Sequence, residues 1–127
     1  MPSVCALVVT YNRSKYLQKA LEGILNQQQE ISGVLIYNNN ATDNTEEILM
    51  NLGYVDSKGD KIKENYLYST EKDGKHFYYY HNDENLGGAG GFANGIRLIS
   101  ELNYDYVWIM DDEVYPEPNC LSEIMKQ

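Results

Sequence analysis

Apolar and β-branched residues gather in four short runs, and each run is bounded by polar or turn-forming residues. Runs of this length and composition are typical of strands that are buried on both faces of a sheet. The third run is rich in tyrosine and is assigned as a strand on its β-propensity. We therefore predict strands over residues 3–10, 33–37, 76–81 and 106–110.

The segments between these runs change to a helical period, with apolar residues three and four positions apart. Ser14 is a candidate N-cap, and Asp43 with Glu46 has the spacing of a capping box. Strands that alternate with helices predict an α/β fold with a largely parallel sheet. The helices are predicted over residues 14–28 and 44–52, after the glycine-rich residues 85–91, and from Asn119 onwards.

Residues 54–75 interrupt this alternation. They are mostly polar, and Gly59 and Gly74 are candidate turn positions. We predict an irregular insertion or an exposed hairpin here. The length of 127 residues otherwise suits one domain.

The composition is that of a globular, acidic protein. Hydrophobic residues make up 43% of the chain, and 10 basic residues stand against 19 acidic ones, which gives a net charge of −9. Disorder driven by low hydrophobicity is excluded, and so is a simple basic footprint for nucleic acid. The acidic excess is concentrated in residues 81–127.

The sequence shows no targeting or membrane-spanning segment. No run approaches the ~20 apolar residues of a membrane helix, and no basic residues precede the first run as they would in a signal peptide. Cys5 and Cys120 match no metal-binding spacing, so we expect free thiols and a cytoplasmic protein.

An unusual polar or glycine-rich loop follows each predicted strand. In a parallel sheet these loops lie together at the carboxyl edge, where ligands of α/β proteins bind. This convergence is stronger evidence than any one loop. The loops are residues 11–13, 38–43, 85–91 and 111–113.

Asp111, Asp112 and Glu113 follow the last predicted strand. Hard oxygen ligands suit Mg²⁺ or Mn²⁺, whose sites commonly combine carboxylates with phosphate oxygens. The alternative is a solvated acidic turn. We favour a divalent-cation site, because three adjacent acids at a strand end repel one another.

The other loops each allow a binding and a structural interpretation. Arg13 could meet a phosphate or simply be exposed. The glycines of residues 85–91 could let the backbone approach a diphosphate, or pack a helix closely against the sheet. The asparagines of residues 38–40 could contact a base or ribose, or form an Asx turn.

Four motifs in this order resemble family 2 glycosyltransferases of the GT-A fold. The motifs are residues 8–13 (VVTYNR), 36–45 (IYNNNATDNT), 85–92 (NLGGAGGF) and 108–113 (WIMDDE). The third motif is most similar to the galactofuranosyltransferase and rhamnosyltransferase branch. The resemblance implies a Rossmann-like, largely parallel open sheet with helices on both faces. It also implies a UDP- or dTDP-linked sugar donor and a divalent cation, Mn²⁺ or Mg²⁺.

The resemblance also implies roles for individual residues. Asn38 stands where the family usually has a base-contacting Asp, and Glu113 replaces the last Asp of the metal motif. The cation would be held by Asp111, Asp112 and Glu113. The nucleotide-sugar would be bound by Thr10, Tyr11, Arg13, Asn38, Asn85, Gly87, Gly88 and Asp111.

Family members carry an acceptor-binding half, with the catalytic base, after the acidic motif. We therefore expect residues 1–127 to be a truncated, donor-binding half, with the base beyond Gln127. The longer protein would transfer a sugar, with inversion, to a glycan or lipid-linked acceptor in cell-surface polysaccharide synthesis, in the cytoplasm or at a membrane. One alternative is a non-catalytic nucleotide-sugar-binding or partner domain. Another is a dinucleotide-binding oxidoreductase module, because residues 88–93 (GAGGFA) fit G-x-G-x-x-A.

Overall fold

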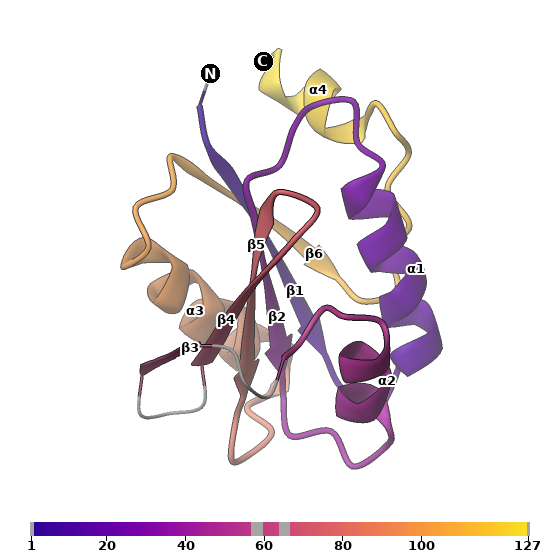
Figure 1. Ribbon diagram of the computed structural model, residues 1–127, viewed down its shortest axis with the longest axis vertical. Helices are drawn as coiled ribbons and strands as arrows, with labels where there is room; N and C mark the ends of the chain where they lie inside the picture. The colour runs from indigo at the N-terminus through magenta and orange to yellow at the C-terminus, as the bar shows by residue number, and fades with distance from the viewer. Residues whose placement is uncertain (1, 57–59, 64–66, 127) are drawn as a thin grey trace.

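The computed structural model describes residues 2–56, 60–63 and 67–126. These form one six-stranded sheet with the strand order β3-β4-β5-β2-β1-β6. Figure 1 shows α3 on one side of the sheet and α1, α2 and α4 on the other. The strands are β1 (Val4–Thr10), β2 (Gly33–Asn38), β3 (Asp60–Lys63), β4 (Leu67–Lys72), β5 (Lys75–His81) and β6 (Tyr106–Asp111). The helices are α1 (Ser14–Leu25), α2 (Thr45–Asn51), α3 (Gly87–Ser100) and α4 (Cys120–Met125).

The four strands predicted from the apolar runs form the parallel part of the sheet. β1 pairs with β2 on one side and with β6 on the other, and β2 pairs with β5. Every residue of β1 and β2 is buried, which explains their continuous apolar sequences. The predicted α/β fold is confirmed, and the ends of these strands meet at one edge.

Each face of the sheet carries its own core. Leu17 and Ile24 of α1, Leu49 of α2 and Leu121 of α4 belong to the core on one face. Leu98 and Ile99 of α3 belong to the core on the other face, together with Leu7 and Tyr37. The expected helices on both faces are thus confirmed. Among the described residues, no helix has the length and apolar character needed to cross a membrane.

The described part of residues 54–75 is more regular than the irregular alternative suggested. β3 and β4 pair antiparallel, and β4 pairs antiparallel with β5 through a turn in which Asp73 and Gly74 have positive φ. The described part of this segment thus forms the hairpin alternative. Tyr68 of β4 packs against the core, which gives this polar segment a buried side. Gly59 lies outside the described residues.

Both predicted helix caps are wrong. Ser14 is the first residue of α1 rather than its N-cap, and its hydroxyl donates to Asn44 Oδ1 instead of accepting from a helix N–H. Asp43 Oδ1 accepts from the backbone N–H of Thr45, as an Asx turn does. Glu46 does not complete a capping box, because its carboxylate contacts Tyr79 of β5.

Helix α3 begins inside the glycine-rich segment, at Gly87, which has a φ of 74°. A Cβ on Gly91 would lie 2.8 Å from Val9 Cγ1, and one on Gly95 would lie 2.7 Å from Leu7 Cδ1. These two glycines therefore allow α3 to approach β1 closely. Gly87 and Gly88 instead lie at the start of the helix, at the carboxyl edge of the sheet.

Candidate functional site

A cleft of about 460 Å³ lies at the carboxyl edge of the sheet, where β1 and β6 end and α3 begins. Eight of the residues expected from the sequence line it, namely Thr10, Tyr11, Arg13, Asn85, Gly87, Gly88, Asp111 and Asp112. Asn39, one of the asparagines considered for contact with a base or ribose, also lines the cleft, whereas Val9, Asn12 and Phe92 were not singled out from the sequence. The predicted Asn38 and Glu113 do not line this cleft. Each of the four loops predicted to converge after the strands therefore contributes at least one lining residue, and for residues 38–43 that residue is Asn39.

The Asp112 carboxylate is held in the interior beneath the cleft. The residue is 2% exposed, and its Oδ2 accepts from Thr10 Oγ1 at 2.9 Å and from the backbone N–H of Tyr11 at 3.4 Å. Burial and the neighbouring Asp111 carboxyl raise the pKa of Asp112 to about 6, although the Thr10 hydroxyl acts in the opposite direction. Asp111 and Asp112 thus bring two carboxyl groups together at the end of β6.

Glu113 takes a different direction from the other two acids. Its carboxylate pairs with the Arg13 guanidinium, which also lies 3.5 Å from Asp112 Oδ1. Among the described residues, no group of three or more His, Cys, Asp or Glu side chains is placed to hold a metal ion. Magnesium sites, however, commonly use one or two carboxylates and complete their shell with phosphate oxygens. The oxygen donors of Asp111 and Asp112 fit that chemistry.

Two consecutive asparagines, one at the end of β2 and the next directly after it, have different roles. Asn38 is 1% exposed, its Nδ2 donates to the Tyr79 hydroxyl at 2.9 Å, and its Oδ1 accepts from the Ala41 N–H at 2.8 Å. Asn39 accepts from the Leu86 N–H at 3.0 Å and donates to the Gly87 carbonyl at 2.9 Å. Asn39, rather than Asn38, therefore lines the cleft and holds the start of α3.

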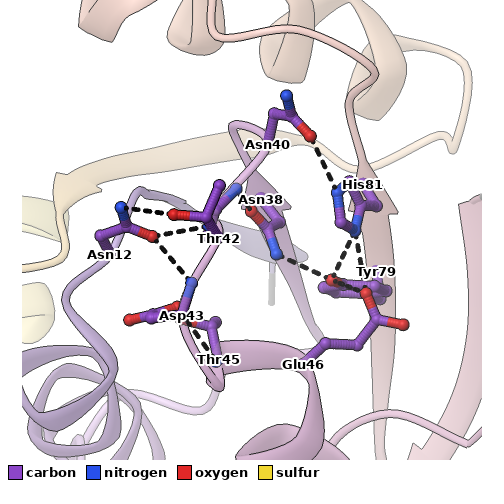
Figure 2. Close-up of polar contacts among 10 residues, drawn as sticks. Asn12, Asn38, Asn40, Thr42, Asp43, Thr45, Glu46, Tyr79 and His81 are labelled. Atoms are coloured by element: carbon purple, nitrogen blue, oxygen red, sulfur yellow. Dashed lines mark hydrogen bonds and ion pairs between the residues drawn. The ribbon is translucent and has the colours of Figure 1, made fainter.

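Asn12 connects the loops after β1 and β2, a role that we did not predict. Its Oδ1 accepts from the N–H groups of Thr42 and Asp43 at 2.8 and 3.1 Å, and its Nδ2 donates to Thr42 Oγ1 at 3.2 Å (Figure 2). Asn12 has a φ of 52°, in the left-handed region that asparagine tolerates better than most residues. The sequence signal for this role was an asparagine two residues after the end of a buried strand.

A second pocket, of about 420 Å³, lies at the ends of β4 and β5 beside α2. Its lining residues are Glu46, Tyr68, Tyr79, His81 and Asp83. His81 Nδ1 lies 2.9 Å from Glu46 Oε2, and the Tyr79 hydroxyl donates to the same oxygen at 2.8 Å. Burial raises the pKa of Tyr79 well above its ordinary value, and the Glu46 carboxylate adds to this effect. The phenol is therefore protonated at neutral pH.

The glycines do not form the turn that a dinucleotide-binding module requires. Such a turn follows its strand directly, with the glycines before the helix. Here residues 82–86 separate β5 from α3, and residues 88–93 lie within the helix. The structure gives no support to the oxidoreductase alternative.

Two curated relatives match nearly the whole of this chain but only part of their own. Galactofuranosyltransferase GlfT1 of Mycolicibacterium smegmatis is 28% identical over 123 residues, which cover 96% of this chain and 34% of the relative. The GalNAc(5)-diNAcBac-PP-undecaprenol beta-1,3-glucosyltransferase of Campylobacter jejuni is 25% identical over 127 residues, which cover 100% of this chain and 35% of the relative. The chain spans about a third of the length of these relatives.

Solved structures share the fold. Crystal structures of Staphylococcus aureus TarS 1–349, one of them in complex with UDP, superimpose with a TM-score of 0.68 at 16% sequence identity. The similarity covers 98% of this chain and 31% of TarS 1–349. These neighbours confirm the expected GT-A fold. The family model described as glycosyl transferase family 2 matches residues 5–127, so this chain belongs to that family.

Proposed function

We propose that this chain is the donor-binding part of an inverting, metal-dependent glycosyltransferase. The observation that carries this proposal is the cleft of about 460 Å³, which gathers Arg13, the start of α3 and Asp111 at one sheet edge. The UDP complex of TarS, which shares the fold, supports a nucleotide-linked donor. We propose a UDP- or dTDP-linked sugar as the donor and a hydroxyl of a glycan or lipid-linked molecule as the acceptor.

The cleft offers groups suited to the diphosphate. Gly87 and Gly88 have open space where a side chain would be, and they lie at the N-terminus of the 14-residue α3. Helix N-termini favour phosphate, because their first N–H groups lack partners within the helix. Arg13 adds a positive charge that is 45% exposed, and Thr10 and Tyr11 form the wall after β1.

We propose that Asp111 and Asp112 hold Mn²⁺ or Mg²⁺. Glu113 can join them only by leaving its ion pair with Arg13. When bound, such a cation acts as a Lewis acid that stabilises charge on the departing diphosphate. The protein contributes the orientation of Asp112, because the Thr10 hydroxyl and the Tyr11 N–H both donate to the same oxygen.

We assign no described residue as the base that deprotonates the acceptor hydroxyl. For the chain alone we therefore propose donor binding with little or no sugar transfer. A radiolabelled-donor assay that detects turnover would overturn this part of the proposal. We also propose a cytoplasmic location, because Cys5 and Cys120 are free thiols.

Titration calorimetry tests the donor site directly. UDP and dTDP are titrated into the chain with and without Mn²⁺, and we expect the metal to strengthen binding at least about tenfold, or 1.4 kcal/mol. Asp111→Asn should abolish this increase. Glu117→Gln is the matched control, since Glu117 is an exposed acid that does not line the cleft. Binding that is equal with and without metal, or unchanged in Asp111→Asn, contradicts the metal assignment.

A further inference from the structure

A chain of hydrogen bonds links Glu46 of α2 to Asn38 at the end of β2. Asn38 Nδ2 donates to the Tyr79 hydroxyl, which donates to Glu46 Oε2 at 2.8 Å (Figure 2). His81 Nδ1 lies 2.9 Å from the same carboxylate oxygen, and His81 Nε2 lies 3.4 Å from Asn40 Oδ1. The end of β2, the strand β5 and the helix α2 are thus connected through the Glu46 carboxylate and its hydrogen-bond partners.

The chemistry of these groups fixes the direction of each bond. A backbone N–H can only donate, so the Ala41 N–H selects the oxygen of the Asn38 amide and turns its NH₂ group toward Tyr79. An ionised carboxylate can only accept, so Tyr79 gives its single proton to Glu46 and accepts from Asn38. Glu46, through Tyr79, therefore favours the same orientation of the Asn38 amide as the Ala41 N–H does.

The Asn38 amide in turn holds the turn over residues 38–43, which adjoins the cleft. Asn39 ties this turn to the start of α3 through Leu86 and Gly87. Asn12 ties it to the loop after β1 through Thr42 and Asp43. Both Asn12 and Asn39 line the cleft. A shift of the turn would therefore move two walls of the cleft.

We propose that Glu46 is a positioning residue for nucleotide binding, acting through Tyr79 and Asn38 on the turn that borders the cleft. This rests on the proposed function. It also explains why position 38 is an amide here. An aspartate at position 38 would place two carboxylates on one phenol, which has a single proton to give.

Glu46→Leu tests the role of the carboxylate, with Glu47→Leu as the matched control, because Glu47 is an exposed acid on the same helix. We expect Glu46→Leu to weaken UDP binding about tenfold, the loss expected for one hydrogen-bonded link to a charged group. Nuclear magnetic resonance gives a second readout. The Asn38 side-chain amide protons should exchange slowly in the wild type and in Glu47→Leu, and quickly in Glu46→Leu.

Moving the carboxylate from position 46 to position 38 gives a second test, in which both hydrogen bonds of Tyr79 can be kept. Asn38→Asp should weaken UDP binding, because the two carboxylates compete for the Tyr79 proton. The double variant Asn38→Asp/Glu46→Gln should restore it, since Tyr79 can donate to Asp and accept from Gln. The proposal is overturned if Glu46→Leu binds UDP as tightly as Glu47→Leu. It is also overturned if the double variant binds UDP no more tightly than Asn38→Asp. A wild-type chain that binds no UDP overturns the proposed donor site itself and is recognised before any variant is measured.

Discussion

The Asp112 carboxylate depends on its neighbours for hydrogen bonds, because it is 2% exposed. Thr10→Val keeps the shape of the side chain but removes the hydroxyl that donates to it at 2.9 Å. We expect this change to lower the free energy of unfolding by about 1.5–3 kcal/mol, as for a hydrogen bond to a charged group. Urea denaturation at pH 8 measures the loss. Thr10→Ser keeps the hydroxyl and is the control, and a Val variant as stable as Ser would contradict this prediction.

Cys5 is a thiol that the fold protects from reagents. It is fully buried in β1, and burial raises its pKa to about 12. Since the thiolate is the reactive form, Cys5 should not react with a disulfide reagent at pH 8 while the chain is folded. We expect one thiol per chain, that of the partly exposed Cys120, to react in buffer and two in guanidinium. Cys120→Ser should leave no reactive thiol in buffer.

Single residues show where sequence reasoning succeeds and where it stops. The acids after β6 and the polar residues after β1 were identified because each directly follows a buried apolar run. Asn38 and Asn39 could not be distinguished by composition, since only the strand geometry decides which of two successive side chains meets Tyr79. The ion pair between Glu113 and Arg13 depends on tertiary structure and has no local signal.

The contact between α3 and β1 depends on the absence of a side chain at Gly95. A Cβ there would lie 2.7 Å from Leu7 Cδ1, and Leu7 is fully buried. We expect Gly95→Ala to lower the free energy of unfolding by about 1–2 kcal/mol, because overpacking outweighs the higher helix propensity of alanine. Thermal or urea denaturation measures the change.

Gly88→Ala is the matched control on the same helix. Nothing lies within 4 Å of a Cβ at Gly88, so alanine meets no obstacle there. We expect its stability to stay the same or to rise by up to about 1 kcal/mol. Equal losses in Gly88→Ala and Gly95→Ala would show that helix flexibility, rather than the close approach to Leu7, sets the result.

Strands with continuous apolar sequences were predicted well. Elements whose position depends on tertiary contacts were predicted less well. β1, β2, β5 and β6 begin and end within a residue or so of the predicted strands. β3 and β4 were expected only as one of two alternatives, an exposed hairpin, because a polar strand near a sheet edge has little apolar alternation. The start of α3 was expected after the glycines, since glycine is a poor helix former. Packing of Gly91 and Gly95 against β1 overrides that preference.

The order of the strands predicts a gradient of stability across the molecule. β1 and β2 lie at the centre of the sheet with every residue buried, whereas β6 pairs only with β1 among the described strands. At the centre of the sheet, we expect backbone amides that exchange only when the whole chain unfolds. At the sheet edges, we expect amides that exchange faster, through local opening. Hydrogen exchange followed by mass spectrometry should give slow exchange in β1 and β2 and faster exchange in the edge strands β3 and β6. Faster exchange in β1 than in β6 would contradict the topology.

The Asn12 contacts have a thermodynamic consequence. Fixing the backbone of one residue costs about 1–2 kcal/mol in conformational entropy, and a flexible loop incurs this loss when a ligand orders it. Here Asn12 already fixes Thr42 and Asp43 through three hydrogen bonds, and it does so without a ligand. The entropy of ordering these two loops is therefore lost during folding. A ligand that enters the cleft therefore does not spend binding free energy on ordering these loops.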